Sequence, residues 1–392
     1  MLAIKGGKII TVTKGVIEEG VILIKSGKIW NIGKNVKVPE EAKIIDAAGK
    51  VVIPGIIDAH CHIGICEENI GWAGEDGNEI TDPVTPHLRV IDAIKANADE
   101  GGLRKALETG ITTVQILPGS ANVIGGLGAV IKTAPKENSE DMIVRNPSGL
   151  KIAFGENPKR VYGLEQKKMP QTRMAIAALL REWLTKGQNY IQQKAMAEKD
   201  NKPFKAPEKD LKLEAMKQVL KREIPLRAHA HRADDMITAI RIAEEFNVDL
   251  SLEHSTEGHR ITNVLFEKKI PVVWGPCLIP RGKWEVRELS FETPKILWKK
   301  GIKFAIMSDG LGQAVSFLPI NAMMAVKHGL SKEEAIKAIT INPAEILGVS
   351  DKVGSLEPGK DADIVIMNGD PFDIMSKVEK VIINGNVELN RS

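Results

Sequence analysis

The sequence has few cysteines and few aromatic residues. It contains three cysteines, Cys61, Cys66 and Cys277, an odd number with no Cys-x-x-Cys pair. This pattern excludes a disulfide-rich scaffold and a cysteine-based zinc site, and it fits the reducing cytoplasm. Only 8 Phe and 2 Tyr occur beside 35 Gly, which predicts an aliphatic core with many tight turns.

Long apolar runs and an excess of one charge are also absent. No stretch reaches the roughly 18 apolar residues that a membrane-spanning helix needs, and the N-terminus lacks the apolar core of a signal peptide. Lys and Arg number 54 against 51 Asp and Glu, without a basic block, which argues against nucleic acid or a membrane as partner. We therefore expect a cytoplasmic protein that binds a small-molecule substrate.

The two ends of the chain share one pattern. Residues 1–53 form short Ile/Val-rich runs separated by glycine turns, and residues 346–392 repeat this character around Pro358-Gly359. We predict that both ends form one small β-sandwich, with a large domain at residues 54–345 inserted between them.

Within the large domain, short Val/Ile-rich runs alternate with helical patterns, which is typical of a parallel sheet with crossover helices. Eight strands are the number that closes a (β/α)8 TIM-like barrel, so we predict this α/β fold. The polar segment 170–221 reads as two helices outside the barrel, with a break near Pro203 and Pro207. The candidate strands are 56–62, 111–117, 127–132, 150–155, 225–229, 249–253, 271–274 and 303–307.

The stretch VVIPGIIDAHCHI, residues 51–63, carries the first candidate functional residues of the large domain. It reads as a buried strand that ends in His60 and His62, which share one face because strand side chains alternate. Two neutral imidazoles side by side can bind zinc, iron or manganese. The alternative is two histidines at a polar strand end without a metal.

Other strand ends carry similar residues. In a barrel of this kind the carboxyl ends of the strands form the active site, and five of the eight histidines in the chain fall there. The pattern therefore predicts that side chains remote in sequence converge around a cation. The strand-end residues are His60, His62, Glu156, His229, His231, His254 and Asp309.

These residues, together with the motifs PGIIDAHCH and GSLEPGKDADIVI, resemble the amidohydrolase superfamily, and within it the imidazolonepropionase-like and Xaa-Pro-dipeptidase-like branch. The resemblance implies a barrel with a composite β-sandwich and one or two divalent metal ions, zinc foremost, with iron or manganese as alternatives. It also implies hydrolysis of a non-peptide C–N bond, in a cyclic amide or an N-acyl small molecule. A homo-oligomer is a further expectation, and no sequence feature fixes its size.

The resemblance also implies residue roles. His60, His62, His229 and Asp309 match the ligands of one metal, and His254 matches a ligand of a second. Asp309 would take the proton from the metal-activated water and pass it to the leaving nitrogen. For His231 two readings stay open, namely contact with the substrate carbonyl or orientation of a ligand.

The group that bridges two metals has two candidates. Many relatives use a carboxylated lysine on the fourth strand, where this chain has Lys151, but Glu156 stands at the predicted strand end on the opposite face. We therefore predict Glu156 as the bridging ligand. A site with one metal and no bridge is the alternative.

The sequence leaves three other functions as alternatives. An Xaa-Pro-type dipeptidase and a deaminase belong to the same class, but deaminases usually add a Glu shortly after the fifth-strand histidine, where His231-Arg232 stands. A non-catalytic barrel used for assembly would be expected to lack metal ligands.

Three cations are predicted near the mouth of the barrel, either to bind a substrate carboxylate or as ordinary surface charge. They are Lys159, Arg160 and Arg173.

Overall fold

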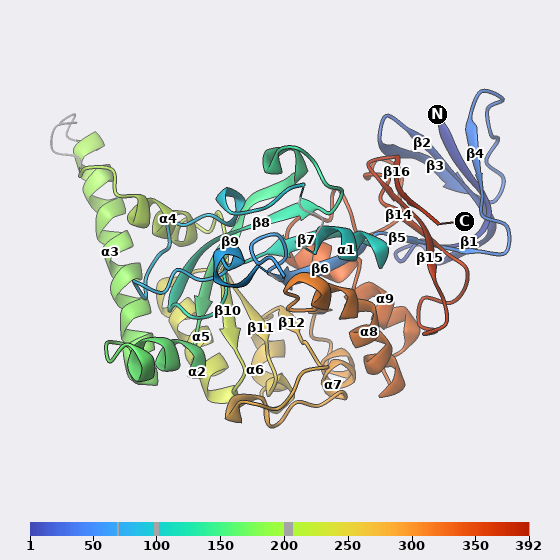
Figure 1. The fold of residues 1–392 in the computed structure, drawn as a ribbon. Helices are drawn as coiled ribbons and strands as arrows, with labels where there is room; N and C mark the ends of the chain where they lie inside the picture. The colour runs from blue at the N-terminus through green and yellow to red at the C-terminus, as the bar shows by residue number, and fades with distance from the viewer. Residues whose placement is uncertain (69, 98–101, 200–206, 392) are drawn as a thin grey trace.

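The computed structural model describes residues 1–68, 70–97, 102–199 and 207–391. The chain folds into two eight-stranded sheets, one small and at one end of the molecule, the other within a larger helical domain (Figure 1). Among the described residues, no helix combines the length and the apolar character needed to cross a membrane.

The small sheet takes strands from both ends of the chain. β5 of the N-terminal segment pairs antiparallel with β14 of the C-terminal segment, and the sheet order is β16-β15-β14-β5-β1-β2-β3, with β4 added to β1. Apolar side chains from both ends, such as Ile22 and Ile364, share its core. The strands are β1 Leu2–Ile10, β2 Val16–Lys25, β3 Lys28–Gly33, β4 Lys43–Asp46, β5 Val51–Pro54, β14 Ile364–Met367, β15 Val378–Ile383 and β16 Asn386–Asn390.

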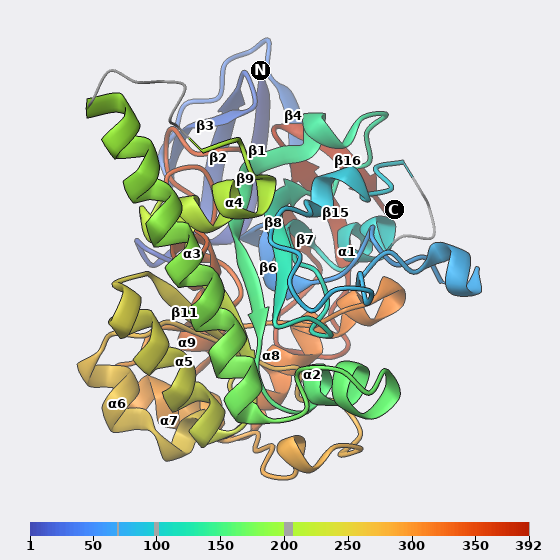
Figure 2. The same ribbon diagram turned by 90° about the vertical axis from the view of Figure 1, so that its left-hand side faces the viewer.

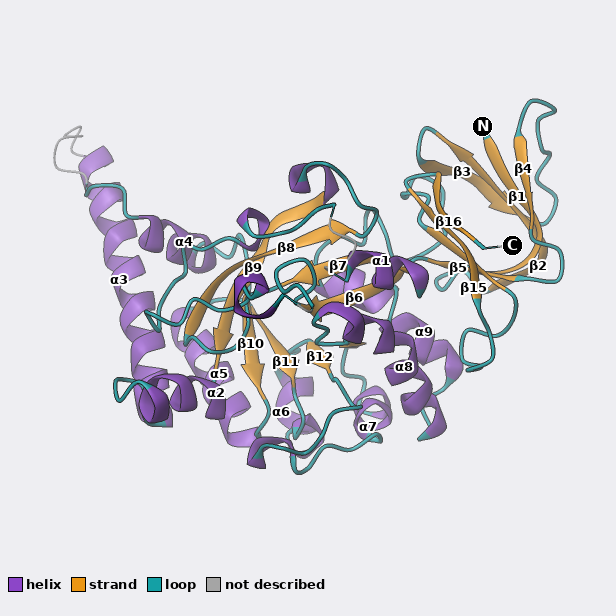
Figure 3. Ribbon diagram, viewed as in Figure 1, coloured by secondary structure: helices purple, strands orange, loops and turns teal. Residues whose placement is uncertain are grey.

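The large sheet is a nearly closed barrel in the order β13-β12-β11-β10-β9-β8-β7-β6. The backbone N–H of Asp309, just after β13, donates to the carbonyl of His60 on β6 at 3.1 Å, which brings the two edge strands together. Helices flank the strands (Figure 3). The strands are β6 Ile56–Cys61, β7 Ile111–Ile116, β8 Ile124–Lys132, β9 Ile143–Ala153, β10 Leu226–Ala230, β11 Leu250–His254, β12 Val272–Trp274 and β13 Phe304–Ile306.

One strand departs from the predicted parallel arrangement. β8 runs antiparallel to both β7 and β9, whereas the other neighbours in the barrel pair in parallel. The segment 117–123 between β7 and β8 is too short for a parallel crossover, which needs about a dozen residues or more. The prediction of a fully parallel (β/α)8 barrel is therefore wrong for this strand.

The helices follow the sequence pattern more closely. Ser331 caps α9 by accepting a hydrogen bond from the backbone N–H of Glu334 at 3.2 Å, which is one of the two hydrogen bonds of a capping box. The helices are α1 Leu103–Glu108, α2 Glu156–Pro158, α3 Arg173–Lys199, α4 Leu211–Leu220, α5 Ala233–Phe246, α6 Thr262–Glu267, α7 Thr293–Lys299, α8 Leu318–Lys327, α9 Lys332–Ala338 and α10 Ile341–Ile346.

Helices α3 and α4 form the predicted pair on the outside of the barrel (Figure 2). Residues Ile176, Leu180 and Leu184 repeat at helical spacing along α3, and all three are buried. The helix thus lies on the barrel through one apolar face. The predicted break at Pro203 lies outside the described residues.

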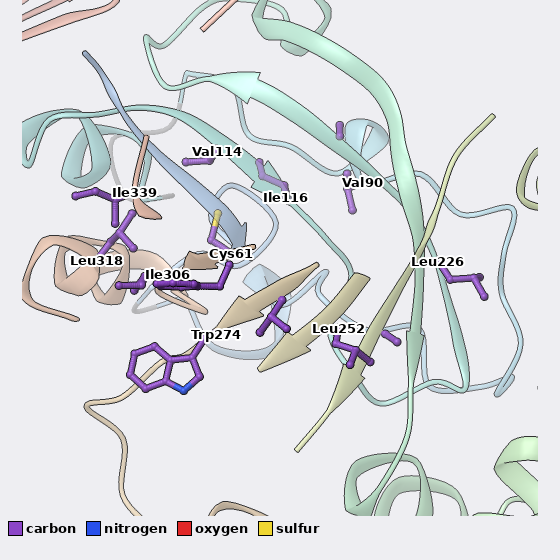
Figure 4. Packing of buried hydrophobic residues seen from close by; sticks show 14 of the residues in the cluster. Cys61, Val90, Val114, Ile116, Leu226, Leu252, Trp274, Ile306, Leu318 and Ile339 are labelled. Carbon is purple, nitrogen blue, oxygen red and sulfur yellow. The ribbon is translucent and has the colours of Figure 1, made fainter. Parts of the chain in front are cut away.

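The aliphatic core fills the space between the barrel strands and their helices (Figure 4). Cys61 on β6, Ile116 on β7 and Leu252 on β11 belong to this core cluster, all with 0% exposed surface. Because successive strand residues point to opposite faces, the packing of Cys61 on the helical side turns His60 toward the barrel interior. The core thereby fixes the orientation of the first histidine.

Candidate active site

His60 and His62 lie at the end of β6 with their rings edge to face, 5.3 Å between centroids. His60 Nδ1 lies 3.0 Å from Glu253 Oε2, and His62 Nδ1 lies 2.7 Å from the carbonyl oxygen of Leu117. These contacts hold Nδ1 of each ring as a donor. Nε2 of both rings is then left to face Asp309.

Asp309 follows β13 and brings a carboxylate to the histidines. Its Oδ1 lies 3.3 Å from His62 Nε2, 3.6 Å from His60 Nε2 and 3.9 Å from His254 Nε2. Burial alone would raise the pKa of Asp309, but the imidazoles of His254, His62 and His60 hold it well below its usual range. Asp309 is therefore ionised at neutral pH.

His229, His231 and His254 come from β10 and β11 and form a second group around the same centre. Their ring centroids are 4.2 to 4.8 Å apart. His254 Nδ1 lies 3.1 Å from the carbonyl oxygen of Gly275, and His231 Nδ1 lies 2.8 Å from Thr256 Oγ1. His254 has φ +70° and Asp309 has φ +54°, a strained backbone that is common at functional sites.

The electrostatics of the histidines suit a cation. Burial is the largest cause that lowers the pKa of His60, His229, His231 and His254 well below the usual histidine value, so the rings are neutral. Neutral imidazoles and one carboxylate are the donors that zinc and related divalent ions bind. Within the described residues His229 Nδ1 is buried without a hydrogen-bond partner, so it stays open to a ligand.

The structure does not bring Glu156 to the histidines, so that prediction is corrected. β9 ends at Ala153, and the chain turns at Gly155 with φ +86° before Glu156 begins α2. Glu156 Oε1 accepts a hydrogen bond from the backbone N–H of Glu285 at 3.1 Å, while Glu285 Oε2 accepts one from the backbone N–H of Glu156 at 2.8 Å. The two loops are thereby joined through reciprocal bonds.

Lys151 occupies the place expected for Glu156. It is fully buried on β9, and its Nζ lies 3.0 Å from His60 Nε2. Burial lowers the pKa of Lys151 to about 8, which increases the neutral amine fraction near pH 7. The strand face predicted to point away from the site therefore points into it.

Sequence reasoning missed two carboxylates. Glu253 precedes His254, and simple strand alternation would place the two on opposite faces, but the positive φ of His254 turns its ring back toward the site. Glu285 lies in the loop after β12, where no periodic pattern marks it. It is buried, and its Oε1 lies 3.8 Å from His231 Nε2. The position of Glu253 beside a strand-end histidine could have predicted a role in the site, whereas nothing in the sequence around Glu285 could.

A cavity of about 470 Å³ opens above the cluster. Ile279, Val286 and Leu311 add apolar walls. Its polar lining includes His62, His229, His231, His254, Asp309, Asn157 and Lys283. A cavity of this size suits a small organic molecule placed against the histidines.

Comparisons with known proteins found similar sequences and similar folds. The model of the family described as "Amidohydrolase family" matches residues 51–387. A crystal structure of an amidohydrolase from Thermotoga maritima superposes with a TM-score of 0.95 at 46% identity and covers 100% of both chains. A Xaa-Pro dipeptidase with bound methionine has a TM-score of 0.59 at 18% identity, covering 98% of this chain and 99% of its own, and shows likeness of fold alone.

Two curated relatives also match. Amidohydrolase tasK of Hapsidospora irregularis is 27% identical over 95% of this chain, which spans 40% of the length of that relative. Imidazolonepropionase of Thermoplasma volcanium is 25% identical over 96% of this chain and 92% of its own length. Both matches extend over nearly the whole chain.

Proposed function

Because the chain belongs to the amidohydrolase family, we propose that it is a metal-dependent hydrolase of a non-peptide C–N bond in a small molecule, a cyclic amide or an N-acyl compound. The observation that carries this proposal is the meeting of Asp309 Oδ1 with Nε2 of His60, His62 and His254 within 3.9 Å. The similarity to an imidazolonepropionase along 96% of the chain supports a small C–N substrate.

The described side chains fit one or two divalent ions. His60, His62, His229 and Asp309 would hold one ion, and His254 would ligate a second. Zinc is the first choice for this set of imidazoles and a carboxylate, with iron or manganese as alternatives. A bound divalent ion supplies Lewis acidity and lowers the pKa of water toward neutrality.

Lys151, in place of Glu156, would be the residue that holds both ions when two are bound. Its neutral amine can add to CO2, forming an N–C bond and releasing one proton, so that the side chain ends in a carbamate with two oxygens. Those oxygens would stand beside His60, whose Nε2 lies 3.0 Å from the amine. Labelled bicarbonate followed by carbon NMR should give a carbamate signal that Lys151→Met lacks.

Asp309 and His231 carry the proton and substrate contacts. The ionised Asp309 carboxylate can accept a proton from the attacking water and return it to the leaving nitrogen. His231 is held by Thr256 Oγ1 at Nδ1, so Nε2 is directed into the cavity. From there it would hydrogen-bond the substrate carbonyl.

The test combines metal analysis with a substrate screen. Purified protein should contain about one or two divalent ions per chain and hydrolyse members of a library of N-acyl amino acids, cyclic amides, dipeptides and amino-purines. His60→Ala should lose metal and activity, whereas His328→Ala, outside the cluster, should keep both. Full activity in a metal-free His60→Ala protein would overturn the proposal. Ammonia release from a purine would favour a deaminase, and cleavage of dipeptides alone would favour a dipeptidase.

A further inference from the structure

A second cavity, of about 610 Å³, adjoins the catalytic cavity. The two share Asn157, Gly282 and Lys283 in their walls. Asn157 is anchored there because its Nδ2 donates to Ser120 Oγ at 2.7 Å and lies 3.5 Å from His229 Nε2. A molecule placed over the histidines can therefore extend past Asn157 into the second cavity, here named the outer cavity.

The charged residues that line the outer cavity are mostly cations. They are Lys159, Arg160 and Lys283, against the single carboxylate of Glu156. Glu156 already accepts the backbone N–H of Glu285 at 3.1 Å. The local charge of the outer cavity is therefore positive.

Within the described part of the chain, none of these cations has an acidic partner closer than 3.9 Å. Arg160 Nη1 is 3.9 Å from Glu165, and Lys283 Nζ is 3.9 Å from the buried Glu285. Lys159 has no ion pair among the residues that the structure describes. By contrast, Arg173, the third cation predicted near the mouth, is engaged with Asp235 at 2.9 Å. Cations that remain without a close carboxylate beside a cavity are suited to bind an anionic ligand.

Lys283 connects the two cavities electrostatically. It lines the same cavity as His229, His231 and His254. Its Nζ lies 3.9 Å from Glu285 Oε1, and that oxygen lies 3.8 Å from His231 Nε2. A carboxylate one or two bonds beyond the scissile amide would therefore meet Lys283 first. Lys159 and Arg160 line the same outer cavity and add to the positive charge around that carboxylate.

We propose that the outer cavity is a carboxylate subsite, and that the substrates are acylated amino acids whose free carboxylate binds Lys283 and Lys159 while the amide lies over the histidines. This inference rests on the proposed function for the position of the amide. In this proposal the segment after β9 and the loop after β12 determine which substrates the enzyme accepts, because both line the outer cavity. A neutral ligand would leave the cations of the outer cavity without a partner.

The test compares each N-acyl amino acid with its carboxamide, which differs only in charge. The wild-type metal-loaded enzyme should favour the acid in kcat/KM by about tenfold or more, the effect of one charge-assisted hydrogen bond. Lys283→Met and Lys159→Met should each reduce this ratio through KM of the acid. Lys37→Met, an exposed lysine in the small sheet domain, is the matched control and should keep the wild-type ratio.

Equal kcat/KM for acid and amide, or an unchanged ratio in both variants, would overturn the subsite. Failure of the hydrolase proposal is distinguishable, because then no member of either series is cleaved. In that case calorimetric titration with glutarate decides the subsite separately. Wild type should bind glutarate at least about tenfold more tightly than Lys159→Met/Lys283→Met. Equal affinity, or no binding to wild type, would reject the carboxylate subsite.

Discussion

Glu253 determines which nitrogen of His60 faces the catalytic centre. Arg227 Nη1 donates to Ser251 Oγ at 3.0 Å, Ser251 Oγ donates to Glu253 Oε1 at 2.6 Å, and Glu253 Oε2 lies 3.0 Å from His60 Nδ1. All four side chains are buried. A carboxylate fixed in this way holds the ring orientation of a ligand histidine and increases its basicity.

We expect Glu253→Ala to weaken metal affinity by about 10- to 100-fold, the usual effect of removing the partner of a ligand histidine. Glu253→Gln should fall between Ala and wild type, because its amide oxygen can still accept from His60 Nδ1 but its NH2 cannot accept from Ser251. Chelator competition measures the affinity. Glu257→Gln is the matched control, since Glu257 is also buried and accepts the backbone N–H of Ala233 at 2.9 Å. Equal affinity for Glu253→Ala and the control would contradict this role.

At the residue scale, strand-end histidines were predictable because their position follows from alternation along an apolar strand. His60 and His62 lie where alternation predicts them, and Asp309 follows its strand as expected. His254 ends β11 as predicted, but its ring faces the site because of its positive φ. The choice between Lys151 and Glu156 failed for a local reason. Gly155 bends the chain away from the direction of β9. Glu156, which follows the apolar run in sequence, is therefore carried away from the histidines, and Lys151 within the strand lies beside them.

Two elements, the segment after β9 and the loop after β12, are joined by the reciprocal bonds of Glu156 and Glu285. Gly155 makes this contact sterically feasible. A Cβ added at Gly155 would lie 2.5 Å from Glu285 Oε2, and the backbone there has φ +86°. Both the close approach and the backbone conformation require glycine.

Gly155→Ala should destabilise the protein by about 1–3 kcal/mol, through backbone strain and displacement of Glu285. It should also lower activity, because Glu285 lies beside His231 and the loop after β12 lines both cavities. Thermal unfolding and kcat/KM measure the two effects. Gly282→Ala, in the same loop but with no atom within 4 Å of the added Cβ, should be close to neutral in stability. Equal melting temperatures for the two variants would reject this account of Gly155.

Helices α3 and α4 provide a prediction for pH dependence. Lys194 and Lys217 donate to the Glu214 carboxylate, and Tyr190 Oη donates at 2.6 Å. These hydrogen bonds, that of Lys194 first, lower the pKa of Glu214 to about 2. The folded pKa lies below the unfolded value of about 4.3, so the stabilisation is complete above pH ~4.3 and is lost as pH falls toward ~2.

We therefore expect Glu214→Gln to lower the melting temperature modestly near neutral pH, since a partly exposed ion pair contributes at most about 1 kcal/mol. Near pH ~2.5 the difference from wild type should shrink, because most of the pH range between the unfolded pKa of about 4.3 and the folded pKa of about 2 has then been crossed. Differential scanning calorimetry at the two pH values measures this change. A difference that grows as pH falls would contradict the assigned role.

At the element scale, helix and strand positions followed from periodicity, but strand direction did not. The run 127–132 was predicted as one more parallel strand because its composition matches the others. Direction depends on the length of the connection before it, and residues 117–123 cannot cross back over the sheet. The length of this connection can be read from the sequence and would have predicted an antiparallel strand. Counting apolar runs alone gives the number of strands but not their direction.

At the scale of the whole molecule, the barrel and the small sheet meet through a buried ion cluster. Lys132 on β8 donates to Asp361 Oδ2 at 3.0 Å and also to Asp363. Asp363 is buried, and desolvation raises its pKa although Lys132 opposes this effect. The matching character of the two chain ends predicted a shared β unit, but no periodic pattern could identify Lys132 as the residue that contacts it.

Lys132→Met should cost about 3–5 kcal/mol in the free energy of unfolding at neutral pH, because it leaves the buried carboxylate of Asp363 without its cation. Without Lys132 the folded pKa of Asp363 rises further above the unfolded value of about 3.9. A group with a raised folded pKa loses stability as pH increases through that pKa, so the deficit of the variant should be larger at about pH 8 than at about pH 5. Urea unfolding at both pH values measures this deficit.

Lys28→Met is the matched control. Lys28 pairs with Asp361 at 2.6 Å with 51% of its side chain exposed, so its loss should cost at most about 1 kcal/mol. If both variants lost the same free energy, or if the Lys132→Met deficit did not change with pH, Lys132 would not be the residue that neutralises Asp363 between the two parts of the molecule.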